Sequence, residues 1–140
     1  MESLAWTELA VGQELPLVEK PPITKVQLVK YAGASGDFNL IHTDDETAHR
    51  VGLPGVIAHG MLSMGFLGDY AAELVGAAGY VALVKVRFSG MVRPGDVLTL
   101  RGKVLEKDED TRTARIAIQA EREPEKPLTA GEAVLSFHRA

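Results

Sequence analysis

The chain has 140 residues, a length suited to one hydrophobic core, so we expect residues 1–140 to form a single domain. Apolar residues make up 46% and charged residues 24%, as in an average globular protein, and the net charge of −4 argues against a general nucleic-acid binder. The chain has no cysteine, which excludes disulfides, thiolate nucleophiles and Cys-ligated metals.

The N-terminal region carries no targeting signal. Residues 1–8 have neither a basic start nor an apolar run, so we predict no signal peptide and a cytoplasmic location. Residues 13–20 predict a short strand, which Pro16 restricts to the edge of a sheet because proline lacks an N–H donor. Pro21 and Pro22 end this segment.

A capping box predicts the first helix. Thr24 is followed three residues later by Gln27, so a helix should begin here and continue to about Ala34. Its inner face is expected to carry Val26, Val29, Ala32 and Gly33.

The stretch from Ser35 to His42 holds the first candidate for chemistry. It places an acid (Asp37), an amide (Asn39) and an imidazole (His42) within six residues, next to a glycine. A spacing of five does not stack two side chains on one helical face, so Asp37 and His42 should converge from a turn. A carboxylate beside an imidazole can move protons near neutral pH.

A second capping box, Thr43 to Glu46, predicts a short helix to about Val51, closed by Gly52 and Pro54.

The longest apolar segment runs from residue 57 to residue 79. Two acids, Asp69 and Glu73, and several glycines interrupt it, so it does not qualify as a membrane span. We expect a helix from Gly60 to Gly76, buried in the protein, with small residues that allow a sheet or a partner helix to approach closely.

The period of the apolar residues then changes to two. Four strands are predicted, at residues 80–89, 96–106, 112–123 and 128–138. Antiparallel strands in this order bury a long apolar helix best by curling around it, which is an α+β domain.

Two motifs carry a resemblance to a known family. Residues 31–42 read Tyr-Ala-Gly-Ala-Ser-Gly-Asp-Phe-Asn-Leu-Ile-His, and with Asp44, Asp45 and Ala48 they resemble the signature of the MaoC-like (R)-specific enoyl-thioester hydratases. Residues 57–63, Ile-Ala-His-Gly-Met-Leu-Ser, are similar to the second landmark of that family, and the similarity extends to residues 86–88 and 93–96.

The resemblance implies a hot-dog fold, in which an antiparallel sheet wraps around a long central helix. It also implies a dimer with ten strands side by side. Leu40 departs from the pattern, because the family commonly has proline at this position, and this bears on the rigidity of the turn.

The implied reaction is the addition of water to a trans-2-enoyl thioester to give an (R)-3-hydroxyacyl thioester, or the reverse dehydration, in fatty-acid metabolism. The resemblance makes this chain a hydro-lyase with Asp37 and His42 as its catalytic pair, and which of the two is acid or base stays open. Gly60 would offer a backbone N–H to the thioester oxygen. Asn39 is expected to support the turn, and Ser63 either contacts the water or thioester or satisfies a backbone group. His59 is expected to be structural or capping.

The expected substrate is an acyl thioester of coenzyme A or acyl-carrier protein, with no further cofactor. Arg87 and Arg93 are candidates to contact the phosphates of that carrier. No metal is predicted, because Asp37-Phe38-Asn39 begins like a calcium loop but has His42 and Ala48 at its sixth and twelfth positions.

Two alternatives remain open. One is a hot-dog acyl thioesterase whose carboxylate would be Asp69 or Glu73 of the long helix. The other is an acyl-binding partner subunit of a heterodimeric dehydratase. The expected assembly is a homodimer, with a higher oligomer or a heterodimer as alternatives, and neither nucleic acid nor a membrane is an expected partner.

Overall fold

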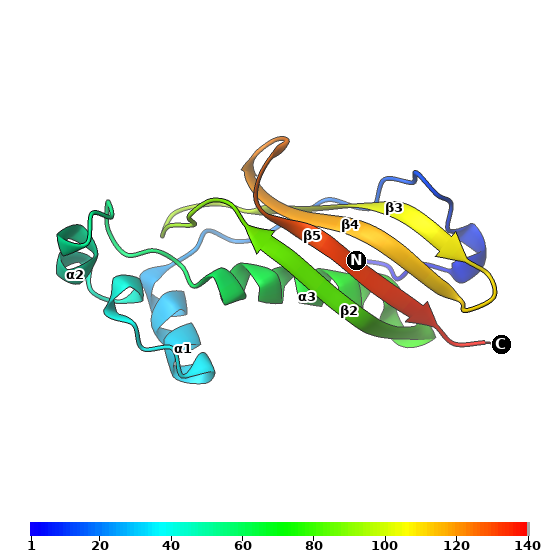
Figure 1. Cartoon of the computed structure of the whole chain (residues 1–140), viewed down its shortest axis with the longest axis horizontal. Coiled ribbons are helices and arrows are strands. Elements are labelled where there is room, and N and C mark those ends of the chain that lie inside the picture. Colours follow the sequence, from blue (N-terminus) through cyan, green and yellow to red (C-terminus); the bar gives the residue numbers. More distant parts are fainter. Residues whose placement is uncertain (140) are drawn as a thin grey trace.

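A curled antiparallel sheet packs against one long helix in the computed structural model, which describes residues 1–139 (Figure 1). The strands lie in the order β1-β3-β4-β5-β2, and all neighbouring pairs are antiparallel. The strands are β1 (Val18–Glu19), β2 (Gly79–Phe88), β3 (Thr99–Asp108), β4 (Thr113–Glu123) and β5 (Lys126–Phe137). The helices are α1 (Lys25–Ser35), α2 (Asp45–Arg50) and α3 (Gly60–Val75), with short 3-10 turns at Trp6–Glu8, Leu40–His42 and Gly76–Ala78. The predicted α+β class and the sheet around a central helix are confirmed.

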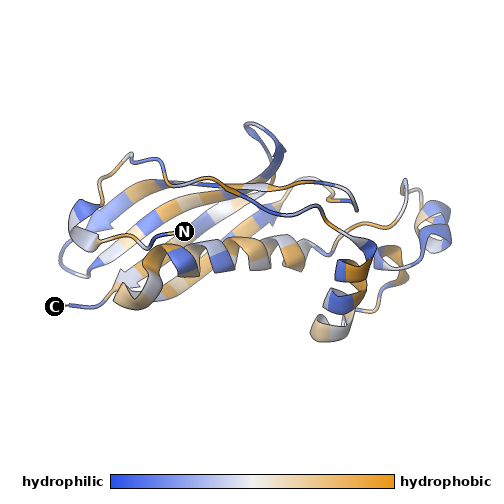
Figure 2. Cartoon of the chain, turned by 180° about the vertical axis from the view of Figure 1, so that it is seen from behind, coloured by the Kyte–Doolittle hydropathy of each residue, from blue (hydrophilic) through white to orange (hydrophobic). Residues whose placement is uncertain are grey.

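The alternation of apolar and polar residues explains the curled sheet. In β4, Ala114, Ile116, Ile118 and Ala120 are all buried, whereas the residues between them are partly exposed. The banding of the strands in Figure 2 shows this alternation. One face of the sheet therefore packs on α3 and the other contacts solvent.

Helix α3 supplies most of the core opposite the sheet. Leu67, Tyr70, Ala71 and Leu74 are buried against inward residues of β3, β4 and β5. Each fully buried leucine contributes about 2 kcal/mol through removal of apolar area from water. The hydroxyl of Tyr70 donates a 2.7 Å hydrogen bond to the carbonyl of Pro16, which ties the helix to the segment before β1. The long buried helix predicted from Gly60 onward is confirmed.

The first strand is shorter than predicted. Only Val18 and Glu19 pair with β3, apart from one isolated bridge from Glu14 to Lys103. The strand lies at the edge of the sheet, as Pro16 predicted.

Helix α1 has the predicted cap but a different inner face. Thr24 Oγ1 accepts a 3.0 Å hydrogen bond from the Gln27 N–H, as expected for a capping residue. The prediction that Val26, Val29 and Gly33 face inward is wrong, because these residues are exposed. Only one narrow side of α1 contacts the protein, and Leu28 and Ala32, four residues apart, occupy that side.

The cap of α2 lies one residue later than predicted. Asp44, not Thr43, caps the helix, and its Oδ2 accepts a hydrogen bond from the Thr47 N–H at 3.3 Å. The Thr43 N–H instead donates to the Leu40 carbonyl and closes the preceding 3-10 turn, which fixes Thr43 outside the helix.

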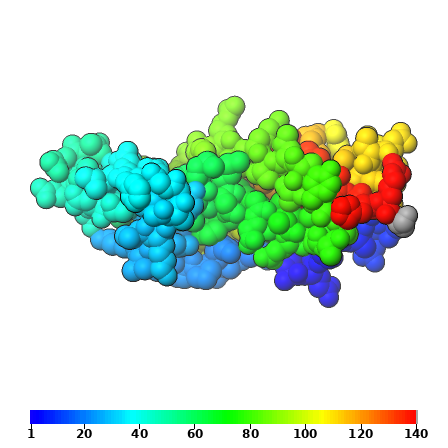
Figure 3. Space-filling view, turned by 90° about the horizontal axis from the view of Figure 1, so that it is seen from below, coloured from blue at the N-terminus to red at the C-terminus, as the bar shows by residue number. Residues whose placement is uncertain are grey.

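A second, smaller apolar cluster holds α1 beside the start of α3. It comprises Ile23, Leu28, Val56, Ala58, Leu62, Val92 and Leu98. Helices α1 and α2 extend past the end of the sheet and form one end of an elongated molecule (Figures 1 and 3). Among residues 1–139, no helix is long and apolar enough to cross a membrane.

Candidate active site

The turn between α1 and α2 is held by its own side chains. Gly36 ends α1 with a φ of 74°, a left-handed conformation that suits glycine. Asp37 Oδ1 then accepts a hydrogen bond from the Asn39 N–H at 3.2 Å, and Asn39 Oδ1 accepts one from the Ile41 N–H at 3.1 Å. Asn39 therefore caps the 3-10 turn that carries His42, which is the supporting position expected for it.

His42 is buried and has one ring nitrogen fixed. Its Nδ1 lies 2.7 Å from the Ile57 carbonyl, and because a carbonyl only accepts, Nδ1 carries the proton. Nε2 lies 3.7 Å from Asp37 Oδ2. The Asp37 side chain is half exposed, with 51% of its surface accessible. The structure thus brings a fixed imidazole and an accessible carboxylate together, as the spacing predicted.

His59 lies directly against this pair. Its ring stacks on the His42 ring with centroids 3.8 Å apart and an interplanar angle of 21°. Its Nε2 lies 3.2 Å from the backbone carbonyl of Asp37, and its ring also contacts Tyr31. His59 occupies the N-cap position of α3 but makes no side-chain capping bond, and its contact with His42 was not anticipated from the sequence.

Gly60 and Ser63 border a cleft of about 150 Å³ beside His59. Gly60 is the first residue of α3, where a backbone N–H has no partner within the helix. A Cβ at Gly60 would lie 3.1 Å from the Phe88 ring, so glycine permits this close approach. The lining residues are Ile57, Ala58, His59, Gly60, Ser63, Phe88, Gly90, Met91, Val92 and Thr129.

Thr129 is a lining residue that the sequence interpretation did not single out. It is only 1% exposed and lies on β5, where Ala133, Leu135 and Phe137 point inward at the same period. A polar residue at an inward position of an apolar strand was the signal that could have found it.

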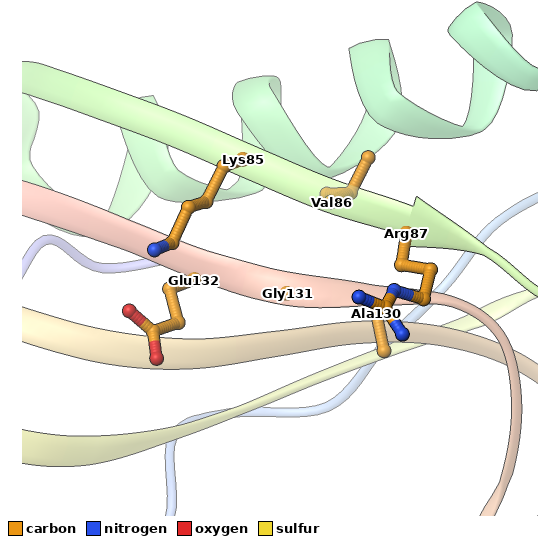
Figure 4. Close-up of a pocket in the computed structure, with 6 residues that line it drawn as sticks. All are labelled: Lys85, Val86, Arg87, Ala130, Gly131 and Glu132. Carbon is orange, nitrogen blue, oxygen red and sulfur yellow. The ribbon is translucent and has the colours of Figure 1, made fainter.

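The two arginines proposed for the thioester carrier lie at different places. Phe88 contacts Gly60, and because neighbouring strand residues point to opposite faces, Arg87 points to the other face of the sheet. In Figure 4, Arg87 shares that open face with Lys85 and Glu132, while Val86 points toward α3. The structure does not bring Arg87 to Asp37 and His42. Arg93 is exposed and directly follows Val92, whose carbonyl accepts a 2.7 Å hydrogen bond from the Ala58 N–H beside the cleft.

The Asp45 carboxylate, close to the turn, links three segments of the chain. Asp45 Oδ2 pairs with Lys25 Nζ at 2.5 Å, and Oδ1 accepts a hydrogen bond from the Val56 N–H at 3.0 Å. The hydrogen bond from Lys25 lowers the pKa of Asp45, and the bond from Val56 lowers it further. These bonds fasten α2 to α1 and to the segment before α3.

Three groups at the site are the right types for metal ligands. Nitrogen or oxygen atoms of Asp37, His42 and His59 lie within 4.8 Å of one another. A metal lies in the plane of each imidazole that binds it, at about 2.1 Å from the nitrogen. The rings of His42 and His59 are stacked and nearly parallel, so their nitrogens cannot both direct lone pairs at one ion. The two rings are therefore poorly placed to bind one metal ion together.

Asp69 and Glu73, the candidate carboxylates of the thioesterase alternative, lie far along α3 from its start beside the Asp37–His42 pair. Asp69 and Glu73 are both exposed on α3. Asp69 lies nine residues after Gly60, about 13 Å along a helix with a rise of 1.5 Å per residue.

Comparisons with known proteins agree with one another. A family model described as MaoC like domain matches residues 7–125. The chain is 30% identical over 115 residues to the 3-hydroxybutyryl-CoA dehydratase of Methylorubrum extorquens, covering 81% of this chain and 72% of that protein. It is 40% identical over 73 residues to the fatty acid synthase beta subunit TOXC of Cochliobolus carbonum, but spans only 4% of that protein's length.

Several solved structures match nearly the whole chain. One of them is the unliganded R-hydratase PhaJ1 from Pseudomonas aeruginosa, with a TM-score of 0.83 and 31% identity, covering 96% of this chain and 86% of that one.

Proposed function

Because the chain belongs to the MaoC-like domain family, we propose that it is a hydro-lyase that interconverts trans-2-enoyl thioesters and (R)-3-hydroxyacyl thioesters. The observation that carries this proposal is the 3.7 Å separation of Asp37 Oδ2 and His42 Nε2. The residue roles that follow are part of the proposal.

Asp37 and His42 hold the reacting water. A separation of 3.7 Å exceeds that of a hydrogen bond, but one water at about 2.8 Å from each atom completes a triangle with them. Because His42 Nδ1 is bonded to Ile57, only Nε2 of the imidazole exchanges protons at the site. Since Asp37 Oδ1 accepts from Asn39, Oδ2 is the oxygen that faces the water.

The proton count of the reaction then balances. The water oxygen bonds to C3 as Oδ2 or Nε2 of the pair takes a proton from it, and the π electrons move toward the thioester. The same proton then passes from the pair to C2 of the enolate, so both groups end as they began. Either free atom, Asp37 Oδ2 or His42 Nε2, can accept the proton, so this role is not assigned to one residue.

Gly60 stabilises the enolate oxygen. Its N–H lies at the positive end of α3, which has 16 residues, and Gly60 lines the cleft together with His59. A donor fixed before the reaction begins stabilises developing charge without reorganisation. Ser63, buried at the same cleft, supports the water or the thioester. Arg93 is retained as a contact for the carrier phosphates, whereas the position of Arg87 gives it no part in the cleft.

No cofactor enters this mechanism, because the hydroxyl group and the proton that are added both come from water. The carrier of the acyl group is coenzyme A or acyl-carrier protein. A cytoplasmic location stays a prediction, which fractionation of cells would check.

The chain is proposed to form a homodimer through β2. This strand is ten residues long and lies at the edge of the sheet, so its outer backbone groups are unpaired within residues 1–139. It also exposes Tyr80, Leu83 and Phe88. A long apolar edge strand pairs readily with another strand, and two copies would join their sheets into ten strands. Light scattering on the purified chain tests this assembly, and a monomer would favour the heterodimer alternative.

A turnover series tests the activity. Enoyl thioesters of several chain lengths, on coenzyme A and on acyl-carrier protein, should lose their enoyl absorbance and yield the (R)-3-hydroxyacyl product. Release of free thiol from acyl-coenzyme A without hydration would support the thioesterase instead. Binding of acyl thioesters with neither reaction would support the role of an acyl-binding subunit.

A further inference from the structure

The ring of His59 contacts both members of the proposed catalytic pair. It stacks on the His42 ring at 3.8 Å, and its Nε2 lies 3.2 Å from the Asp37 carbonyl. The side chain is almost fully buried, with 2% of its surface accessible. One side chain therefore fixes the plane of the imidazole and the backbone that carries the carboxylate.

The hydrogen bonds define the protonation state of His59. A carbonyl only accepts, so Nε2 carries a proton and donates it to Asp37. The other nitrogen, Nδ1, is buried and has no hydrogen-bond partner within residues 1–139. A second proton on Nδ1 would bury an unpaired cationic N–H next to another histidine, which is strongly unfavourable. His59 is therefore a neutral imidazole with its proton on Nε2.

Ordinary structural roles do not explain this arrangement. His59 precedes α3 directly, but its side chain makes no capping bond to the helix. A buried histidine with one unsatisfied nitrogen costs stability relative to an apolar residue of the same size. The titratable groups that contact it are Tyr31, Asp37 and His42, two of which form the proposed catalytic pair.

We propose that His59 is a positioning residue that holds His42 and Asp37 in the geometry for hydration. The proposal rests on the function proposed above. The stacked His59 ring prevents the His42 ring from rotating away from Asp37 Oδ2. The bond from His59 Nε2–H to the Asp37 carbonyl keeps the backbone of Asp37 in place. When His42 is protonated during turnover, the neutral ring beneath it also stabilises the imidazolium through its π face.

This role requires both the ring face and the Nε2–H donor of the His59 side chain. His59→Gln retains a donor near the position of Nε2 but has no ring, His59→Phe retains the ring face but has no donor, and His59→Leu has neither. We expect His59→Leu to lower kcat for crotonyl-coenzyme A about 10- to 100-fold, as loss of alignment by a fraction of an ångström does, with KM changed by less than about threefold. The kcat of His59→Gln and that of His59→Phe should each lie between the kcat of His59→Leu and that of the wild type. His138→Leu is the matched control, because His138 is exposed at the far end of β5, and its kcat should equal that of the wild type.

Imidazole NMR provides a measurement that does not depend on turnover. The chain has four histidines, so the long-range ¹H–¹⁵N spectrum is simple to assign. In the wild type, His59 should carry its proton on Nε2 and none on Nδ1, and His42 should carry a proton on Nδ1, held by the Ile57 carbonyl. In His59→Leu, the Nδ1–H signal of His42 should broaden or disappear.

The outcomes separate this inference from the proposed function. If the wild type does not hydrate enoyl thioesters, the proposed function fails. If the wild type is active and folded His59→Leu matches its kcat, the positioning role is wrong. A charged His59, or one protonated on Nδ1, in the wild-type spectrum would overturn it even if the variants do not fold.

Discussion

Asp37 Oδ2 and His42 Nε2 lie 3.7 Å apart, and the other polar atom of each group is already bonded, Oδ1 to the Asn39 N–H and Nδ1 to the Ile57 carbonyl. Each group therefore directs one free atom at the same point. This relationship makes the two side chains a unit, and the effect of removing either one follows from it.

Replacement of Asp37 or His42 should strongly reduce hydration without unfolding the chain. Asp37→Asn and His42→Gln each remove one proton acceptor of the pair, and we expect a decrease in kcat of about 10²- to 10⁴-fold for crotonyl-coenzyme A. Asp37 is exposed, so the melting temperature of Asp37→Asn should stay close to that of the wild type. Asp69→Asn is the matched control on the exposed face of α3, and it should leave hydration unchanged. Full activity of both pair variants would contradict the mechanism, and an equal loss of hydration in Asp69→Asn would show that the effect is not specific to the pair.

Two substitutions at Gly60 separate its N–H from its size. Gly60 is the first residue of α3, where proline is tolerated, and the ψ of 134° at His59 suits a residue before proline. Gly60→Ala adds a Cβ that meets the Phe88 ring at 3.1 Å, and because Phe88 is half exposed its ring can move. Gly60→Pro adds the same Cβ and removes the N–H. We expect kcat of Gly60→Pro to lie about 100-fold below that of Gly60→Ala, as for loss of one oxyanion donor.

The control for Gly60 is another helical glycine. Gly33 lies inside α1, and a Cβ there meets no atom within 4 Å. Gly33→Ala should raise the free energy of unfolding by up to about 1 kcal/mol and leave turnover unchanged. Equal activity of Gly60→Ala and Gly60→Pro would remove the N–H of Gly60 from the mechanism.

The long-range architecture could be predicted because it follows from periodicity. From Thr113 to Ala120 the residues of β4 are alternately partly exposed and buried, and the apolar run from Gly60 onward is too long for a strand and too interrupted for a membrane span. The Asp37–His42 pair was predictable because both residues lie in one short turn whose glycine and asparagine determine its local shape.

Contacts between distant segments could not be predicted in this way. His59 is 17 residues from His42 in the sequence, and the rings meet because Ile57, in the segment before α3, is hydrogen-bonded to Ile41 and His42 of the 3-10 turn. The inner face of α1 was missed because Val26 and Val29 are as apolar as Leu28, and tertiary contact alone decides which of them is buried. The cap of α2 was misplaced because Thr43 and Asp44 are both good capping residues.

Removal of metal ions should not affect turnover. The stacked rings of His42 and His59 cannot converge on one ion. Asp45 and His49 lie four residues apart on α2 and could also bind a metal, but Asp45 already bonds to Lys25 and Val56, and His49 to Pro54. Dialysis against a chelator should leave kcat and KM unchanged, and elemental analysis should find less than one metal ion per chain. Loss of activity on chelation with recovery on addition of one metal would show that the site binds a metal.

Proline at position 40 should stabilise the turn. Leu40 is the first residue of the 3-10 turn, it is exposed, and Asn39 has a ψ of 124°, which a residue before proline favours. The bonds that close the turn use the carbonyls of Asn39 and Leu40 and the N–H groups of later residues, so the Leu40 N–H is not needed. Leu40→Pro should raise the free energy of unfolding by about 0.4–1 kcal/mol, measured by urea denaturation, with turnover retained. A destabilised or inactive variant would show that this turn requires a conformation that proline cannot adopt.

Glu121 should make the stability of the fold depend on pH in the acid range. Its side chain is 3% exposed, and it accepts hydrogen bonds from Arg101 at 2.8 Å and from Gln119 at 2.7 Å. Burial alone would raise the pKa of Glu121, but the bonds from Arg101, Gln119 and the Glu125 N–H outweigh it and lower the pKa. A carboxyl group with a lowered pKa in the folded state stabilises the fold above its unfolded pKa of about 4.3, and this contribution is lost as pH falls through the folded value.

Glu121→Gln should therefore lower the free energy of unfolding by about 1.5–3 kcal/mol at pH 7, as expected for hydrogen bonds to a charged group, and the difference from the wild type should shrink as the pH falls below about 4. Urea denaturation of both proteins from pH 7 to pH 3 measures this, with Glu73→Gln, exposed on α3, as the control, and a difference that stays constant over this range would rule out the lowered pKa as its cause.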